Sequence, residues 1–269
     1  MTTLLVTLMF ACTSSTPDPV VEETPTKTFN AVDINELAAA VDKAELVPSP
    51  LEMEQKLQSA GLQKELGALV TTKDISVIVD DLDQVAIRTG VVMSDLVLTL
   101  KTSESKDILH NLGKMKAGLA KLGAGSDIDA TIGDFEQRIG DAEVKRSELL
   151  TEFDELSQVM VSELEYEAGE WVVPLIQAGT WLEGANLVSQ AMIQEGKFDA
   201  ADEFFRQKEI VEYFISYIDR EGKDRAPDGI VTKLLETLNT LKAISGKPKL
   251  DESDVKEINK LTTLVLNLL

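Results

Sequence analysis

Apolar residues along most of this chain recur at intervals of three or four, the spacing of one face of an α-helix. No stretch alternates apolar and polar residues over the length of a strand. Start and stop signals separate the helical stretches, as in Ser49-Pro50-Leu51-Glu52, a capping box with proline at the first helical position. The pattern predicts helices over about 33–46, 49–61, 74–100, 104–122, 126–168, 171–193, 199–220, 228–245 and 252–268.

The most regular of these stretches is 126–168, which we expect Ser126 to cap. An unbroken helix of this length would be about 65 Å long, with Gly133 and Gly140 as the positions where it could bend. We therefore expect an all-α fold in which residues 30–269 form a single helical domain. It would have about eight antiparallel packed helices, one long central helix, and a possible subdivision near 123–126.

Residues 171–193 are almost entirely apolar, with Glu183 as the only charged residue. Polar side chains nevertheless recur every three or four positions and form one stripe: Gln177, Thr180, Glu183, Asn186, Gln190 and Gln194. A lipid-facing helix would not tolerate such a stripe cheaply. We therefore expect this segment to be a central helix of a bundle rather than a membrane span.

Charge is the strongest feature of the composition, since 26 Lys and Arg stand against 47 Asp and Glu for a net charge of −21. This balance argues against binding to nucleic acid or to anionic lipid, both of which need clustered basic residues. More than half of the excess, −11, falls within residues 126–170. The usual explanation is a solvated face. The alternative is an acidic ridge for a protein partner with a basic surface.

One cysteine and one histidine limit the possible chemistry, because a disulfide or a structural zinc site cannot be built from them within one chain. Asp107 and His110 have the spacing used in di-iron bundles, but those need the motif twice. We expect His110 to be an ordinary surface residue. The acidic clusters 80–83 and 126–131 suggest calcium but are better explained as solvated helix starts. We expect no catalytic, metal or cofactor site.

Residues 4–11 form a short apolar run that ends directly before Cys12, and this arrangement resembles the lipobox of bacterial lipoproteins. The resemblance implies a signal peptide over 1–11, cleavage before Cys12, and acylation of that cysteine with fatty acids such as palmitate. Met9 and Phe10 depart from the usual pattern, and an ordinary signal peptide is the alternative. Thr13 favours the outer membrane by the same resemblance. The proline-containing residues 12–29 have the composition of a flexible tether.

Four short segments also resemble recurring motifs of a group of uncharacterised all-helical bacterial lipoproteins. The residue usually aromatic in that group is Val92 here. The group has no established activity, so the resemblance implies only fold and location. The segments are Pro48–Met53, Gly90–Leu96, Ala178–Gly184 and Arg206–Lys208.

Two features of the second half are candidate sites. Glu183 lies in apolar surroundings and needs a partner if buried, so we predict a structural pair with Arg206 on the next helix; an exposed polar stripe and a ligand-binding carboxylate are the alternatives. Aromatic residues concentrate between 166 and 217 and are expected to pack in the core. A ligand pocket is the alternative for these, lined by Trp171, Trp181, Phe205, Tyr213 and Tyr217.

The sequence thus favours a lipid-anchored, non-enzymatic binding or scaffold module of the bacterial cell envelope. A binder of a small apolar ligand in the aromatic half is the second hypothesis. An acid-catalysed hydrolase is the third, which would require two carboxylates about 5 to 9 Å apart in a cleft.

Overall fold

The computed structural model describes residues 47–269, except 71–74, 142–143 and 223–227. Its described elements are all helical, without a strand, which confirms the predicted all-α fold. The predicted signal peptide, Cys12 and the predicted tether lie outside the described residues. The elements are α2 (Pro50–Ser59), the 3₁₀ helix η1 (Leu66–Ala68), α3 (Leu82–Thr99), α4 (Ser105–Leu122), α5 (Ser126–Ile139), α6 (Arg146–Ala168), α7 (Val172–Glu195), α8 (Ala201–Phe205), α9 (Lys208–Tyr217), the π-helix η2 (Ile218–Gly222), α10 (Asp228–Ser245) and α11 (Glu252–Leu268).

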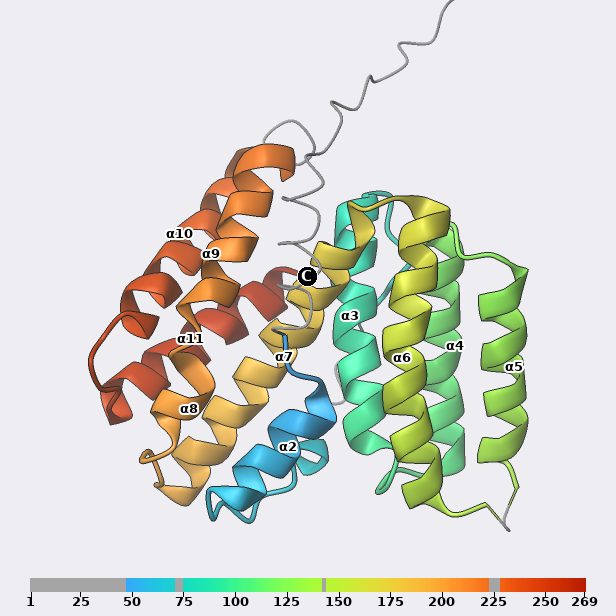
Figure 1. The fold of residues 1–269 in the computed structure, drawn as a ribbon, viewed down its shortest axis with the longest axis horizontal. Helices are drawn as coiled ribbons and strands as arrows, with labels where there is room; N and C mark the ends of the chain where they lie inside the picture. Colours follow the sequence, from blue (N-terminus) through green and yellow to red (C-terminus); the bar gives the residue numbers. More distant parts are fainter. Residues whose placement is uncertain (1–46, 71–74, 142–143, 223–227) are drawn as a thin grey trace, which may run out of the picture.

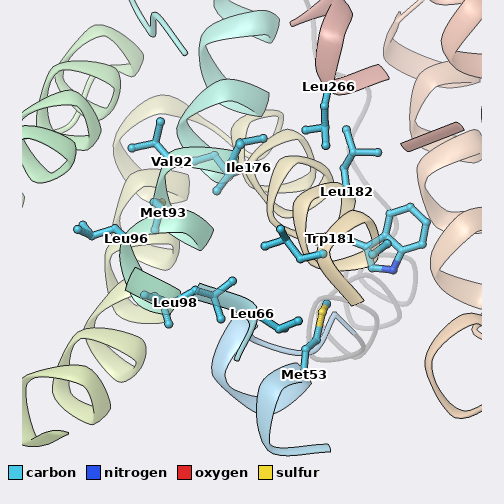
Figure 2. Packing of buried hydrophobic residues seen from close by; sticks show 14 of the residues in the cluster. Met53, Leu66, Val92, Met93, Leu96, Leu98, Ile176, Trp181, Leu182 and Leu266 are labelled. Atoms are coloured by element: carbon cyan, nitrogen blue, oxygen red, sulfur yellow. The ribbon is translucent and has the colours of Figure 1, made fainter. Parts of the chain in front are cut away.

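The helix α7 lies in the middle of the molecule, between α3–α6 on one side and α8–α11 on the other (Figure 1). It packs mainly on α3 and α11, while α2 covers one end of the α3–α7 contact. Figure 2 shows side chains from these elements meeting in the core, including Met93 and Leu96 of α3, Ile176 and Leu182 of α7, and Leu266 of α11. Buried apolar residues on both sides of 123–126 belong to this one cluster.

The single long helix predicted over 126–168 is wrong, because the segment forms the antiparallel hairpin of α5 and α6. Helix α5 ends at Ile139, with Gly140 as its C-cap. The Phe135 and Phe153 rings, one from each helix, lie 4.9 Å apart. The apolar face of α5 therefore packs against the apolar face of α6, which buries both faces in one core.

Polar contacts fix both ends of this hairpin. Near the turn, Arg138 of α5 forms a bidentate ion pair with Glu152 of α6, with Nη2 2.7 Å from Oε2. At the other end, the N-cap residue of α5 is Gly125 rather than the predicted Ser126. The Gly125 backbone amide donates to Glu167 Oε2 at 2.6 Å. A carboxylate from α6 thus occupies the positive end of the α5 dipole.

Helix boundaries elsewhere follow local capping chemistry. The capping box predicted at Ser49 and Glu52 is present, with Ser49 N donating to Glu52 Oε2 at 2.9 Å. Helix α3 begins at Leu82 rather than near Asp74, because Asp81 is its N-cap and accepts from Gln84 N at 3.0 Å. The helix predicted over 199–220 is divided into α8, α9 and η2. None of the described helices combines the length with the apolar composition that a membrane-spanning helix requires.

Candidate functional site

Helices α3 and α7 cross closely in the core, and each contributes a buried glycine to the crossing. A methyl group added at Gly90 would overlap the Ile176 carbonyl oxygen and lie 3.0 Å from Thr180 N. One added at Gly179 would overlap the Ile87 carbonyl oxygen in the same way. Thr180 Oγ1 also donates to Gly90 O at 3.2 Å. The two backbones therefore touch, and the side chains beyond the crossing are brought close together.

Two carboxyl groups meet beyond the crossing, Asp95 on α3 and Glu183 on α7, and they are joined by a side-chain hydrogen bond. Glu183 is buried. The Asp95 Oδ1 atom is also buried, and it accepts no hydrogen bond from the described residues. Burial raises the pKa of Asp95 well above its usual range, and the nearby Glu183 raises it further, while Lys114 of α4 opposes the shift. Two ionised carboxylates in contact would repel each other, which favours a form of the pair that holds one proton.

This arrangement differs from the predicted Glu183–Arg206 pair. Arg206 is exposed and its ion-pair partner is Asp202, one helical turn before it, with Nη1 3.9 Å from Oδ2. Asp95 was not recognised from sequence, although it is the only charged residue between 89 and 100. A single charged residue in an otherwise apolar segment is the same feature that identified Glu183. A hydrogen-bonded carboxyl pair is also closer than the spacing of about 5 to 9 Å that the hydrolase hypothesis requires.

Farther along α7, the polar stripe faces α11. Asn186 Nδ2 donates to Thr263 Oγ1 at 2.7 Å and to Thr262 Oγ1 at 3.0 Å. In return, Asn259 Nδ2 donates to Asn186 O at 3.2 Å and to Ser189 Oγ at 3.1 Å. Gln190 is half-buried. At these positions the stripe is a set of contacts between helices, not an exposed surface.

Replacing Asn186 with alanine should lower the free energy of unfolding by about 1 to 3 kcal/mol, because the change removes one donor shared by several acceptors at a buried interface. Urea unfolding of the variant measures this loss. Asn239→Ala is the matched control, since Asn239 is exposed on α10 and, within the described part of the chain, donates to Leu235 O of its own helix. It should change stability by less than about 0.5 kcal/mol. Equal losses for both variants would contradict a structural role for the stripe.

The aromatic residues of the second half pack mainly in the core. The Trp181 ring lies 6.0 Å from Phe214, and Tyr213 lies 5.4 Å from the same ring. Tyr217 Oη donates to Trp171 O at 2.8 Å, and burial raises the pKa of Tyr213 to about 12. At 1.5 Å per residue, Trp171 and Trp181 are about 15 Å apart along the axis of α7.

A small cavity does lie beside Trp181 and Phe205, where Met53 of α2 approaches them. Its volume is about 10 Å³, the space of about one water molecule. Pockets for small ligands have volumes of roughly 300 to 1,000 Å³. This cavity therefore has no room for an apolar ligand in the structure as it stands.

The remaining candidates lie at the surface. His110 is exposed on α4, as predicted. The acidic residues of both clusters lie at the starts of α3 and α5, where negative charge favours the positive end of the helix dipole. Over the described residues, no group of three or more Asp, Glu, His or Cys side chains is placed to hold a metal ion.

A surface feature that the sequence analysis did not resolve lies on α6. Val159 and Tyr166 are exposed by 55% and 93%, opposite the buried face that contains Phe153 and Met160. Glu155 and Glu163 are exposed on the same side of the helix. We call these four residues, Glu155, Val159, Glu163 and Tyr166, the α6 ridge. At 100° per residue they fall within about 80° of the helix circumference.

The ridge is an acidic environment with little compensating charge. Neither Glu155 nor Glu163 has an ion-pair partner among the described residues. Burial raises the pKa of Glu165, and the carboxylate of Glu170, which follows the helix, raises it further. Negative charge and exposed apolar surface therefore occur together on one helix.

Comparisons of the chain with family models, curated proteins and solved structures gave no match.

Proposed function

We propose that this protein is a lipid-anchored, non-enzymatic binding or scaffold module of the bacterial cell envelope, which engages a protein partner through the α6 ridge. The observation that carries the proposal is the almost complete exposure of Tyr166 on the same side of α6 as Val159 and two carboxylates, neither of which has an ion-pair partner in the part of the chain that the structure describes. Tyrosine is enriched among residues that dominate binding energy at protein interfaces. The anchor rests on the lipobox resemblance at Cys12, and the tether would let the helical domain stand clear of the lipid headgroups.

The anchor is tested by Cys12→Ser in the native bacterium. We expect this variant to lose incorporation of labelled palmitate and to leave the membrane fraction, because two or three acyl chains hold a protein on a bilayer essentially permanently. Thr13→Ser is the control and should change neither result. A Cys12→Ser protein that stays in the membrane fraction would contradict lipid anchoring.

Binding is tested separately by placing a photo-crosslinking amino acid at Tyr166 in the anchored protein and irradiating intact cells. A discrete crosslinked product at Tyr166 is expected, because this side chain would lie inside the interface. Leu268 of α11, which is 56% exposed, is the matched control position and should give no such product. The same product at both positions, or none at Tyr166, would overturn the assignment of the ridge as the binding surface.

A further inference from the structure

We infer that the partner of the α6 ridge is a basic amphipathic helix, an inference that rests on the proposed binding function. Val159 and Tyr166 are seven residues apart on α6, which places two exposed side chains with apolar surface one heptad apart on the same helix. Helices that pack side by side meet through apolar residues at this spacing. The ridge from Glu155 to Tyr166 is about 17 Å long, so it would cover about three turns of a partner helix.

The charges on the ridge indicate that the partner helix is positively charged. Glu155 lies one turn before Val159, and Glu163 lies one turn after Val159 and one turn before Tyr166, so each apolar residue has a carboxylate one turn away on the same side of the helix. In paired helices the charged residues that flank an apolar seam select the partner. Lysine or arginine at the flanking positions of the partner would neutralise Glu155 and Glu163, and an arginine over the Tyr166 ring would add a cation–π contact.

The same charges disfavour two other occupants. A second copy of this chain would place the Glu155 and Glu163 carboxylates of one ridge against those of the other, in a protein whose net charge is −21. An anionic membrane surface would repel the ridge for the same reason. A cationic helix is the occupant whose charge complements that of the ridge.

The probe is a labelled synthetic helical peptide of about 20 residues, with leucine at heptad spacing and arginine at the flanking positions. Its binding to the full chain carrying Cys12→Ser is followed by fluorescence anisotropy. We expect saturable binding that weakens when salt is raised from about 50 to 300 mM, because exposed charge pairs are screened. A peptide with glutamate in place of each arginine should not bind.

Tyr166→Ala and Glu163→Lys should each weaken binding about tenfold. The matched controls are Leu268→Ala, an exposed apolar residue of α11, and Glu209→Lys, an exposed acid of α9, and both should bind as the parent protein does. Equal weakening by ridge and control variants, or no binding of the arginine peptide, would overturn the basic-helix partner. A dimer in sedimentation that Tyr166→Ala abolishes would replace that partner with a second copy.

The two proposals can fail separately. A crosslink at Tyr166 in cells without peptide binding would leave the binding module in place and reject only the basic helix. The absence of both results would reject the ridge as a binding surface.

Discussion

Gly90→Ala is expected to destabilise the protein by about 3 kcal/mol or more, at or above the upper end of the range for overpacked cores. The added methyl group would overlap the Ile176 carbonyl oxygen and lie 2.9 Å from its carbonyl carbon. Both obstacles are backbone atoms of α7, which cannot rotate away as a side chain would. The helices must therefore separate, and the apolar contacts of the α3–α7 interface are lost along its length.

The matched control is Gly113→Ala, which makes the same chemical change in the exposed middle of α4. A methyl group there would meet no atom within 4 Å. Alanine is favoured over glycine in a helix by about 0.8 to 1.0 kcal/mol, so this variant should be more stable than the parent protein. Urea unfolding of both variants measures the contrast. Similar midpoints for Gly90→Ala and the parent protein would show that the crossing is not closely packed.

Gly179→Ala provides a second test of the same crossing, because its methyl group would overlap the Ile87 carbonyl oxygen. Once one alanine has separated the helices, the second should cost less. The double variant is therefore expected to lose less stability than the two single losses added together, as neighbouring sites do when they share one structural change. Additive losses would indicate two independent defects.

Most helices were predictable from sequence because local chemistry sets their ends. Ser49 and Glu52 form their capping box within four residues, and Gly123 ends α4 in the left-handed conformation with φ +103°. The α5–α6 turn was missed because apolar residues at helical spacing resume after it, so the period alone does not mark the break. Whether such a segment forms one straight helix or a hairpin depends on what its apolar face packs against, and here Phe135 of α5 packs against Phe153 of α6.

The candidate sites depended still more on tertiary contacts. Glu183 was recognised as an acid in an apolar helix, but its partner was assigned by proximity along the chain. The close crossing at Gly90 and Gly179 instead brings α3 against α7 and places Asp95 beside Glu183. Tyr166 was grouped with the core aromatics, although it lies on the exposed side of α6. Composition indicates which residues are unusual, while packing decides which of them meet.

The Asp95–Glu183 pair should make the protein lose stability as pH rises. The folded-state pKa of Asp95 is raised, whereas an unfolded aspartate has a pKa near 3.9. Between these two values the folded chain binds more protons than the unfolded chain, so the free energy of unfolding falls with increasing pH. The stabilising effect of the shared proton is complete below the unfolded pKa and disappears as pH rises through the folded pKa.

Glu183→Gln should reduce this dependence, because it removes the part of the Asp95 pKa shift that Glu183 causes and leaves the part that burial causes. The glutamine amide can donate a hydrogen bond to Asp95 without a titrating proton, and Lys114 then supports an ionised Asp95. The stability advantage of the variant over the parent protein should therefore grow with pH, by up to about 1.4 kcal/mol per pH unit for one proton. Urea unfolding at intervals between about pH 5 and 9 measures the difference, and Asp95→Asn should give a profile of the same form.

The remaining acidic residues also respond to pH, so the difference between matched variants carries the test. Glu209→Gln removes one exposed carboxylate of α9 and leaves the α3–α7 interface intact. Its profile should run parallel to that of the parent protein, because the substitution lies outside the α3–α7 interface and leaves the Asp95–Glu183 pair unchanged. If Glu183→Gln also ran parallel, the two carboxyl groups would not share a proton, and the contact between α3 and α7 at this point would have to be wet and open rather than buried.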